Sequence, residues 1–325
     1  MPKVSIIVPN YNYARFLGER LGSIERQTFR DFEVILLDDA STDEGVQALE
    51  RFARLHQCIL ICNDRNSGSP FKQWDKGLNL ATGQYVWIAE ADDYADERFL
   101  EVMVGRLDQN PRCGIAYCGS KRVDDTGNVK ELVLPTMYDV NRDRWLRDFV
   151  ADGREECIRF LLRENTIPNA SAVVFRRDLY DVASGVDERL RLCSDWKFWA
   201  SLLLVSDLVF VAEPLNYFRA HGKSMRSKTH TWEQVIEGLQ VMKYILEGVG
   251  VPRDALADLH TRLAIIFLHA YITQRPSAAE RVRVRELAAG LEFSFSRRAA
   301  SGFAGQLLQV LARWFRSGST GRYLG

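Results

Sequence analysis

The segment from Tyr85 to Asp93 constrains the fold of this 325-residue chain more than any other. An apolar run of buried-strand character, Tyr-Val-Trp-Ile-Ala, leads directly into Glu90, Asp92 and Asp93. Parallel sheets bury both faces of their strands, and ligands bind outside the carboxyl ends of those strands. Carboxylates gathered there are suited to Mg²⁺ or Mn²⁺, which proteins hold with one or two carboxylates plus substrate phosphates. A solvated acidic loop is the alternative interpretation of this segment taken alone.

Strands and helices are predicted to alternate along the first 120 residues. The hydrophobic pattern predicts strands over residues 4–8, 32–37, 58–62 and 114–118, and helices near residues 16–24, 46–52, 71–81 and 99–107. Ser41 or Thr42 is expected to cap the second helix. Such alternation is typical of βαβ units, so we expect an α/β fold with a mostly parallel sheet flanked by helices.

Composition narrows the range of partners and compartments. Basic and acidic residues balance at 43 each, so no global field favours nucleic acid as a partner. The six cysteines form no C-x-x-C pair and lie mostly in apolar runs, which favours a reducing, cytoplasmic compartment. The first apolar run stops at Pro9, too early for a signal peptide, and no uninterrupted run reaches membrane-spanning length.

The usual glycine signatures of phosphate binding are absent. Pro9-Asn10-Tyr11-Asn12 follows the first strand, where a dinucleotide-binding chain would need G-x-G-x-x-G to bring its backbone against a pyrophosphate. The chain also lacks a G-x-x-x-x-G-K-[ST] loop. A metal held by carboxylates is therefore the expected way of handling phosphate charge.

Four short motifs follow one another in the first part of the chain. They are Val4–Asn12, Gln27-Thr28 followed by Phe32–Asp43, Gly77–Tyr85 and Glu90–Asp93. Together they resemble the first strand and nucleotide loop, the "DDGSTD" turn, the helix before the metal strand and the "DxDD" motif of family 2 glycosyltransferases. The resemblance implies the GT-A fold and inverting transfer of a sugar from a nucleotide-diphosphate sugar.

Two residues depart from the family pattern. Ala40 stands where the turn usually has glycine, so we expect this turn to avoid positive φ. Glu90 replaces the first Asp of the metal motif and is one methylene longer. It is expected to act through a water or to touch the ribose, which leaves Asp92 as the metal ligand.

The resemblance also implies a nucleotide-sugar site. Asp39 would accept a hydrogen bond from the imide N–H of a uracil-like ring, so a UDP-type donor is expected. Lys72 could reach a phosphate, or could be a solvated lysine on a helix face. The other residues expected in this site are Pro9, Tyr11, Asn12, Glu90 and Asp93.

The second half of the chain is expected to supply the acceptor site and the base. Cys193–Trp199 resembles the "(E/D)DWxLW" element of the family, whose Asp is the catalytic base. Inverting transfer needs one carboxylate to take the proton of the acceptor hydroxyl, and Asp195 is the candidate. Trp196 and Trp199 are expected on the acceptor side. The alternative role of Asp195 is the N-cap of a helix.

The last recognisable element is Phe218–His221, which resembles the family's "YRxH". His221 is expected to complete the metal shell, or else to be structural. We therefore expect a catalytic domain over residues 1–222, with a nucleotide-sugar half (1–120) and an acceptor half (121–222), and a helical extension over 223–325. After Glu292 this extension has arginines among apolar residues and no acids, so it predicts peripheral contact with an anionic membrane or a helix packed on the domain.

The sequence thus predicts a metal-dependent inverting glycosyltransferase acting on a glycan or lipid-linked acceptor. The resemblance suggests cell-surface polysaccharide synthesis in the cytoplasm, at the inner face of the cell membrane. Two alternatives stay open: a nucleotide-sugar-binding protein without turnover and a sugar nucleotidyltransferase.

Overall fold

The structure is a computed structural model that describes residues 1–133, 142–183, 185–221, 231–250, 259–260, 263, 266–267, 270 and 274–291. The chain divides into two compact units. The first contains residues 1–157 and 164–221, and the second contains residues 158–163 and 222–325. Within the described ranges, no helix combines the length and the apolar character needed to cross a membrane.

The first unit is built on a mixed β-sheet with the strand order β3-β2-β1-β4-β9-β6-β10-β5, with β7 beside β6 and β8 beside β10. The strands are β1 (Val4–Asn10), β2 (Phe32–Asp38), β3 (Ile59–Cys62), β4 (Tyr85–Ile88), β5 (Tyr94–Ala95), β6 (Cys113–Val123), β7 (Val129–Val133), β8 (Phe149–Ala151), β9 (Val173–Arg176) and β10 (Asp207–Arg219).

Strand direction divides this sheet into two parts. β3, β2, β1 and β4 run parallel, as the sequence predicts. β9 runs antiparallel to both β4 and β6, so the sheet is mixed beyond β4 rather than mostly parallel throughout. The apolar run in β9 predicts a buried strand but carries no information on its direction, because direction depends on the connection that precedes it.

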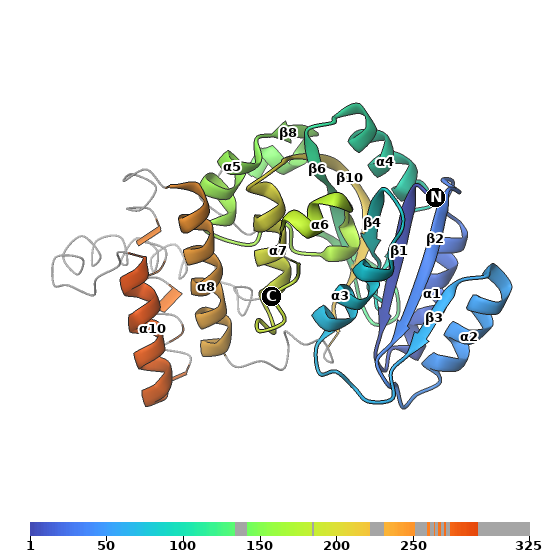
Figure 1. Ribbon diagram of the computed structural model, residues 1–325, viewed down its shortest axis with the longest axis horizontal. Coiled ribbons are helices and arrows are strands. Elements are labelled where there is room, and N and C mark those ends of the chain that lie inside the picture. The colour runs from blue at the N-terminus through green and yellow to red at the C-terminus, as the bar shows by residue number, and fades with distance from the viewer. Residues whose placement is uncertain are drawn as a thin grey trace. The chain divides into compact units, whose positions relative to one another are not determined.

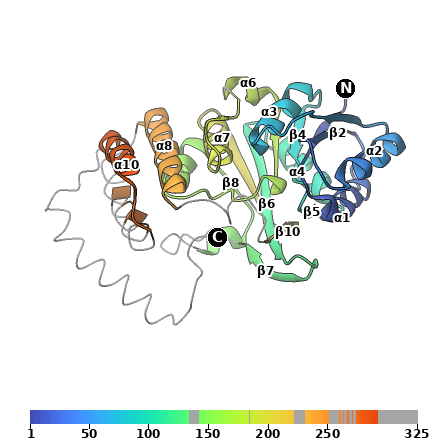
Figure 2. The same cartoon turned by 90° about the horizontal axis from the view of Figure 1, so that it is seen from below.

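Helices cover both faces of the sheet (Figures 1 and 2). Ile6 and Val8 of β1 share a core cluster with residues of α1 and α4, whereas Ile7 between them faces α3. This alternation follows from the two-residue period of a strand. The helices of this unit are α1 (Ala14–Glu25), α2 (Gly45–His56), α3 (Pro70–Leu80), α4 (Phe99–Gln109), α5 (Gly153–Glu156), α6 (Asp178–Val182) and α7 (Ser194–Leu203).

The second unit contains the helices α8 (Thr231–Val249) and α10 (Ala278–Gly290). α10 begins with a capping box, in which Ser277 Oγ accepts from Glu280 N and Ser277 N donates to Glu280 Oε2. Trp232 of α8 donates its indole N–H to the carbonyl of Gln274 over 2.7 Å. The predicted membrane-binding segment after Glu292 lies outside the described residues.

Candidate active site

The acidic segment after β4 is joined to the end of β10. Asp92 Oδ2 lies 2.9 Å from Nε2 of His221, a residue 129 positions further along the chain. The imidazole is fully buried and packs against Tyr13 and Phe16, with ring centroids 5.4 and 5.3 Å away. The pair places one carboxylate and one imidazole side by side, and the expectation that His221 completes a metal shell stays a prediction.

Glu90 points to a different partner from Asp92. Its Oε1 accepts a hydrogen bond of 2.7 Å from the indole Nε1 of Trp74 in α3. Trp74 in turn packs against Trp199 of α7, with ring centroids 6.1 Å apart. The two carboxylates of the expected metal motif are thus directed to separate walls of the site.

Asp93 is almost completely buried and serves the fold. Its Oδ1 accepts the backbone N–H of Arg219 over 2.9 Å, and the hydroxyl of Ser171 donates to the same carboxylate. Contact between Asp93 and a nucleotide sugar stays a prediction. The Asp93 carboxylate fastens β10 and the segment of Ser171 to the acidic loop.

Two buried arginines hold the backbone of the acidic loop. Arg20 of α1 donates from Nε to the carbonyl of Glu90 over 2.8 Å and from Nη2 to Ser171 Oγ over 3.1 Å. Arg219 donates from Nε to the carbonyl of Asp92 over 2.9 Å. Backbone carbonyls held by guanidinium groups on both sides leave this loop little freedom.

The sequence interpretation missed these arginines, but one signal was present. Arg20 falls on the same helical face as Leu17, Leu21 and Ile24, all of which are buried. An arginine on the apolar face of a helix is unusual unless it has a buried carboxylate or carbonyl partner. Arg219 precedes His221 in the last strand, and nothing in its local sequence indicates which carbonyls it binds.

The electrostatics of the acidic loop favour an additional cation. Burial and the neighbouring Asp92 raise the pKa of Glu90 to about 8, although the Trp74 hydrogen bond and Arg20 act in the opposite direction. Burial and Asp92 also raise the pKa of Asp93. Negative charge is therefore crowded here, and a divalent cation would relieve it.

The donor set fits Mg²⁺ or Mn²⁺ when phosphates complete the shell. Across the described residues, no group of three or more His, Cys, Asp or Glu side chains forms a complete metal site. Asp92 and His221 would provide two ligands to such an ion, which is usually bound by one or two protein groups plus substrate phosphates. A site of this kind is incomplete until a diphosphate arrives.

Asp38 and Asp39, which follow each other at the end of β2, have separate tasks. Asp38 is fully buried, and its carboxylate accepts from the backbone N–H of Ser41 over 2.8 Å and from Asn10 Nδ2 over 2.7 Å. Ala40, which lies between Asp39 and Ser41, has φ of +60°, so the expectation that this turn avoids positive φ was wrong. The return of Ser41 to the Asp38 carboxylate requires that conformation.

The residues expected to cap α2 belong to this turn instead. α2 begins at Gly45 and has no side-chain N-cap, which corrects the prediction for Ser41 and Thr42. Ser41 Oγ donates to Asp38 Oδ2, while Thr42 N donates to Asn12 Oδ1 over 2.8 Å. These hydrogen bonds join the turn after β2 to the loop after β1.

Asp39, which is expected to accept a hydrogen bond from the nucleotide base, is already hydrogen-bonded within the protein. Its Oδ1 accepts from Asn63 Nδ2, from the backbone N–H of Ser67 and from Gln73 Nε2, at 2.6, 2.9 and 2.9 Å. Its Oδ2 accepts from Ser67 alone, through N and Oγ. A base would have to use the remaining capacity of Oδ2, so contact between Asp39 and a base stays a prediction.

The other nucleotide-side residues differ in accessibility. Pro9 is buried in β1 opposite Leu37, whereas Tyr11 is 44% exposed and can offer its ring to a ligand. Asn12, with φ of +58°, holds the turn described above. Lys72 is exposed in the first turn of α3, with Nζ 3.3 Å from the carbonyl of Ser67.

Asp195 lies at the start of α7 but is not its N-cap. The helix begins at Ser194 after Cys193, which makes no side-chain cap. Asp195 Oδ1 accepts from the backbone N–H of Trp196 over 2.7 Å, and Oδ2 accepts from Asn165 Nδ2 over 3.3 Å. The capping alternative therefore does not explain this aspartate.

The two tryptophans after Asp195 are core residues. Trp199 has no exposed surface and packs against Trp74 and Phe175, so contact between its indole and an acceptor stays a prediction that this packing does not favour. Trp196 is 8% exposed. The aromatic spacing that suggested a sugar platform arises from the apolar face by which α7 covers the sheet.

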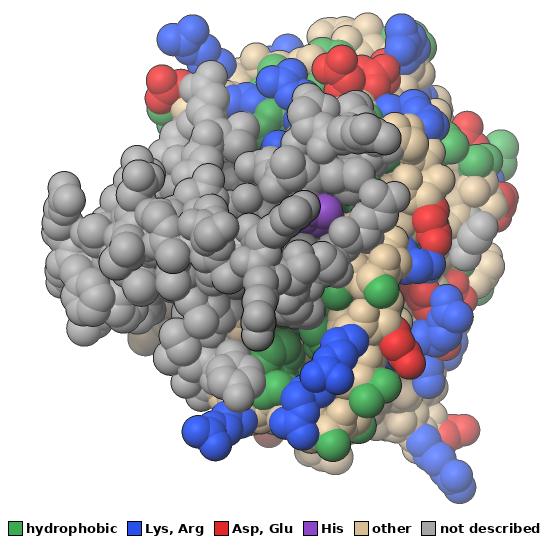
Figure 3. All heavy atoms as spheres, turned by 90° about the vertical axis from the view of Figure 1, so that its left-hand side faces the viewer, with side chains coloured by type: hydrophobic (Ala, Val, Ile, Leu, Met, Phe, Trp, Pro, Cys, Tyr) green, Lys and Arg blue, Asp and Glu red, His purple; other side chains and the backbone are tan. Residues whose placement is uncertain are grey.

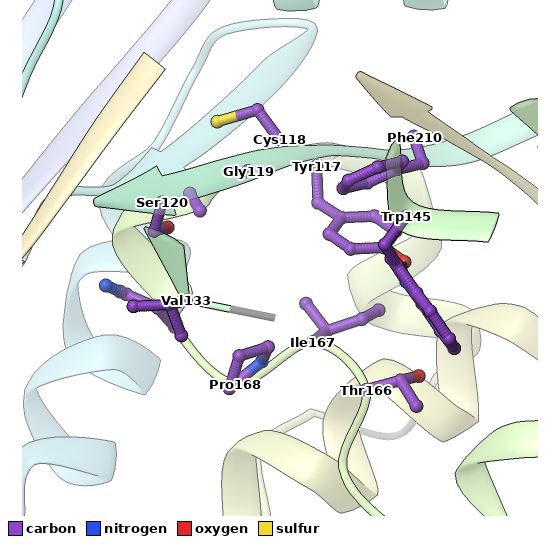
Figure 4. Close-up of a pocket in the computed structure, with 12 residues that line it drawn as sticks. Tyr117, Cys118, Gly119, Ser120, Val133, Trp145, Thr166, Ile167, Pro168 and Phe210 are labelled. Atoms are coloured by element: carbon purple, nitrogen blue, oxygen red, sulfur yellow. Dashed lines mark hydrogen bonds between the residues drawn. The ribbon is translucent and has the colours of Figure 1, made fainter. Parts of the chain in front are cut away.

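A cavity lies beside this site, between β6 and residues 166–169 (Figure 4). It is small, with a volume of about 20 Å³, and no Asp, Glu, Lys, Arg or His lines it. The Thr166 hydroxyl and the Asn169 Nδ2 at its wall are buried without hydrogen-bond partners among the described residues. The cavity adjoins the acidic loop through Asn169, which caps the turn that carries Ser171.

The surface charges agree with the balanced composition. On the face shown in Figure 3, Lys and Arg side chains form small groups, with Asp and Glu side chains among them. This arrangement resembles an ordinary mixed protein surface.

Comparisons with known proteins identify the family. The family model described as glycosyl transferase family 2 matches residues 5–183. An uncharacterised glycosyltransferase of Haemophilus influenzae is 25% identical over 255 residues, 77% of this chain and 76% of that protein. Glycosyltransferase GlyG of Streptococcus pneumoniae is 28% identical over 240 residues, 69% of this chain and 73% of that protein. Poly(ribitol-phosphate) beta-N-acetylglucosaminyltransferase TarS of Staphylococcus aureus is 33% identical, but over only 34% of this chain and 20% of TarS.

Solved structures share the fold. S. aureus TarS 1–349 in complex with UDP-GlcNAc aligns with a TM-score of 0.63 at 19% identity, covering 89% of this chain and 80% of that one. The mannosyltransferase PcManGT of Pyrobaculum calidifontis, in complex with GDP-Man and Mn²⁺, aligns with a TM-score of 0.56 at 18% identity, covering 96% and 86%. The expected fold class is thereby confirmed. Since the family model covers more than half of the residues, the chain belongs to glycosyl transferase family 2 and is a glycosyltransferase.

Proposed function

We propose that this protein transfers a sugar, with inversion, from a nucleotide-diphosphate sugar to a hydroxyl of a glycan or lipid-linked acceptor. The observation that carries the proposal is the acidic loop after β4, which directs Asp92 to His221 and leaves its other oxygen without a hydrogen-bond partner among the described residues. Structural relatives in complex with UDP-GlcNAc and GDP-Man support a donor of this class. A UDP-type donor is our first expectation.

Asp195 would act as the base. Its carboxylate takes the proton of the acceptor hydroxyl as that oxygen attacks the anomeric carbon and the bond to the diphosphate breaks. Mg²⁺ or Mn²⁺, held by Asp92 and His221, would stabilise the charge on the departing diphosphate. Arg20 and Arg219 keep the acidic loop in position during the step, because they bind its carbonyls from two sides.

The names of the relatives and the fold suggest cell-surface polysaccharide synthesis as the setting. GlyG and TarS are bacterial glycosyltransferases, and TarS is named for the transfer of N-acetylglucosamine to poly(ribitol-phosphate). We propose the cytoplasmic face of the cell membrane as the place of action, where nucleotide sugars and lipid-linked acceptors meet.

The substitution Asp195→Asn tests the proposal. Positioned general-base catalysis contributes about 10²–10⁴-fold, so transfer should fall by at least 10²-fold while affinity for the donor barely changes. Product analysis by mass spectrometry, with donor affinity from calorimetry, gives both quantities. Asp181→Asn, at an exposed position of α6, is the matched control and should be fully active.

Three outcomes separate the candidate functions. Transferred sugar supports the proposal, released pyrophosphate indicates a nucleotidyltransferase, and binding without any product indicates a nucleotide-sugar-binding protein. Near-normal turnover of Asp195→Asn would assign the base to another residue.

A further inference from the structure

We propose that Trp74 is a positioning residue that aims Glu90 at the sugar being transferred, so that Glu90 binds a hydroxyl of that sugar and not the metal. The inference rests on the proposed function, because it assumes that a nucleotide-diphosphate sugar occupies the site. It adds a contact that selects among donor sugars.

The backbone of Glu90 is fixed on both sides. Its N–H donates to Ser171 Oγ over 3.1 Å, and its carbonyl accepts from Arg20 Nε over 2.8 Å. Both partners are completely buried. The backbone of Glu90 is therefore held in place, and the position of the carboxylate depends only on the side-chain rotamer.

Trp74 selects one of those rotamers. Its Nε1 donates to Glu90 Oε1 over 2.7 Å, and an indole N–H can only donate, so it recognises the carboxylate and not a cation. The ring is 3% exposed and is packed by Phe71 and Trp199, with centroids 5.2 and 6.1 Å away. Such a ring cannot move to follow the carboxylate.

One oxygen of Glu90 is left for a ligand. Oε2 has no hydrogen-bond partner among the described residues, although the side chain is only partly exposed. A carboxyl oxygen of this kind can accept a hydrogen bond from a neutral O–H group of a ligand. The positive end of the Trp74 N–H dipole beside it makes the same place unfavourable for a metal ion.

The direction of Glu90 fits the position of the sugar. Asp92 faces His221 at the end of β10, whereas Glu90 faces Trp74, which packs on Trp199 of α7. Asp195 lies one turn before Trp199 in the same helix. In an inverting displacement the attacking and leaving oxygens lie on opposite sides of the anomeric carbon, so the sugar lies between base and diphosphate. Glu90 is directed toward the wall of the site formed by α3 and α7, which carries the base.

Binding measurements test this assignment without relying on turnover. Calorimetry with Mn²⁺ present would compare UDP with UDP-GlcNAc and GDP with GDP-mannose, using the pair that the unaltered protein binds more tightly. In Glu90→Ala, affinity for the nucleotide sugar should fall about tenfold to a hundredfold, the effect of leaving a sugar hydroxyl in the site without its hydrogen-bond partner. Affinity for the nucleoside diphosphate alone should change less than twofold.

Trp74→Phe isolates the positioning role, since it keeps an aromatic ring and removes the N–H. It should weaken nucleotide-sugar binding about threefold to tenfold and leave binding of the diphosphate unchanged. In the Glu90→Ala background it should have no further effect. The matched control is Trp145→Phe, which removes another buried indole N–H, the one donated to Tyr117 Oη, and should alter neither affinity.

Each other result would overturn the inference. Equal weakening of diphosphate and nucleotide sugar by Glu90→Ala would show that Glu90 serves the metal or the nucleotide. Additive losses in the double variant would show that Trp74 acts only through packing. If the unaltered protein binds none of the four compounds, the proposed function itself fails, which is a distinguishable outcome because no variant is needed to observe it.

Discussion

Ala40 adopts a backbone conformation that an alanine rarely takes. Its φ of +60° is one of three positive values at non-glycine positions among the described residues, with Asn12 and Gln57. Asn tolerates this region because its short polar side chain binds locally, and alanine has no such compensation. Asp38 maintains the strain at Ala40, because its carboxylate accepts hydrogen bonds from both the backbone N–H and the hydroxyl of Ser41.

Replacing Ala40 by glycine should therefore stabilise the protein. The left-handed conformation costs a residue with a Cβ about 1–2 kcal/mol, and the greater freedom of glycine in the unfolded chain offsets part of the gain. We expect a net gain of about 1 kcal/mol, seen as a rise of roughly 2–4 °C in Tm by calorimetry. Gln57→Gly, at the end of α2 with φ of +53°, is the matched control and should gain a similar amount.

Loss of stability in Ala40→Gly beside a gain in Gln57→Gly would contradict this account of the turn. Such a result would mean that the alanine methyl group contributes packing that outweighs the backbone strain. A stabilised Ala40→Gly variant with weaker nucleotide binding would instead assign the strain to function.

At the scale of elements, α3 approaches the sheet more closely than a side chain would allow. A Cβ on Gly77 would lie 2.4 Å from Cγ2 of Ile7 in β1, so the helix rests directly on the strand. The same helix carries Trp74 and Gln73, which contact Glu90 and Asp39. The close approach of α3 therefore sets the position of two side chains in the site.

Gly77→Ala should destabilise the protein by about 1–3 kcal/mol, because inserting a methyl group into a filled core forces its neighbours apart. Gly105→Ala in α4 is the matched control, since no atom lies within 4 Å of the added Cβ. It should gain up to about 1 kcal/mol from helix propensity alone. Urea unfolding measures both, and equal responses of the two variants would refute the packing argument.

The elements themselves were predictable where the hydrophobic period was strong. β1, β2, β4, α1 and α4 begin within a few residues of their expected positions, because their apolar residues are spaced for one buried face. The direction of β9 and the N-terminal capping of α2 were not predictable in this way. The first depends on chain connections. The second was obscured because Ser41 and Thr42 form hydrogen bonds to side chains at the end of β2 and in the loop after β1.

At the scale of the whole molecule, the site is assembled from segments far apart in the sequence. The acidic loop meets Arg20 from α1, Ser171 before β9, and Arg219 and His221 from the end of β10. Sequence motifs could nominate Asp92 and His221 one at a time. They could not show that Glu90 turns to Trp74, that Trp199 is enclosed, or that Asp39 is already hydrogen-bonded, because these facts arise from tertiary packing.

This assembly makes a prediction for metal binding that can be measured on the intact protein. Asp92, Glu90 and Asp93 crowd negative charge that Arg20 and Arg219 only partly balance, so Mn²⁺ with a nucleoside diphosphate should stabilise the fold. A ligand present at a hundred times its Kd contributes about 2.7 kcal/mol, which appears as a rise in Tm.

Asp92→Asn keeps the shape of the side chain and removes the charge that holds the ion. In this variant the nucleoside diphosphate should raise the Tm by the same amount with and without Mn²⁺. In the unaltered protein, Mn²⁺ should raise the Tm by a further increment. Asp125→Asn, an exposed carboxylate 3.5 Å from Arg15, is the matched control and should keep that increment. If Mn²⁺ raises the Tm of Asp92→Asn as much as that of the unaltered protein, the Asp92 carboxylate beside His221 is not needed to bind the metal. The metal would then be held by other ligands.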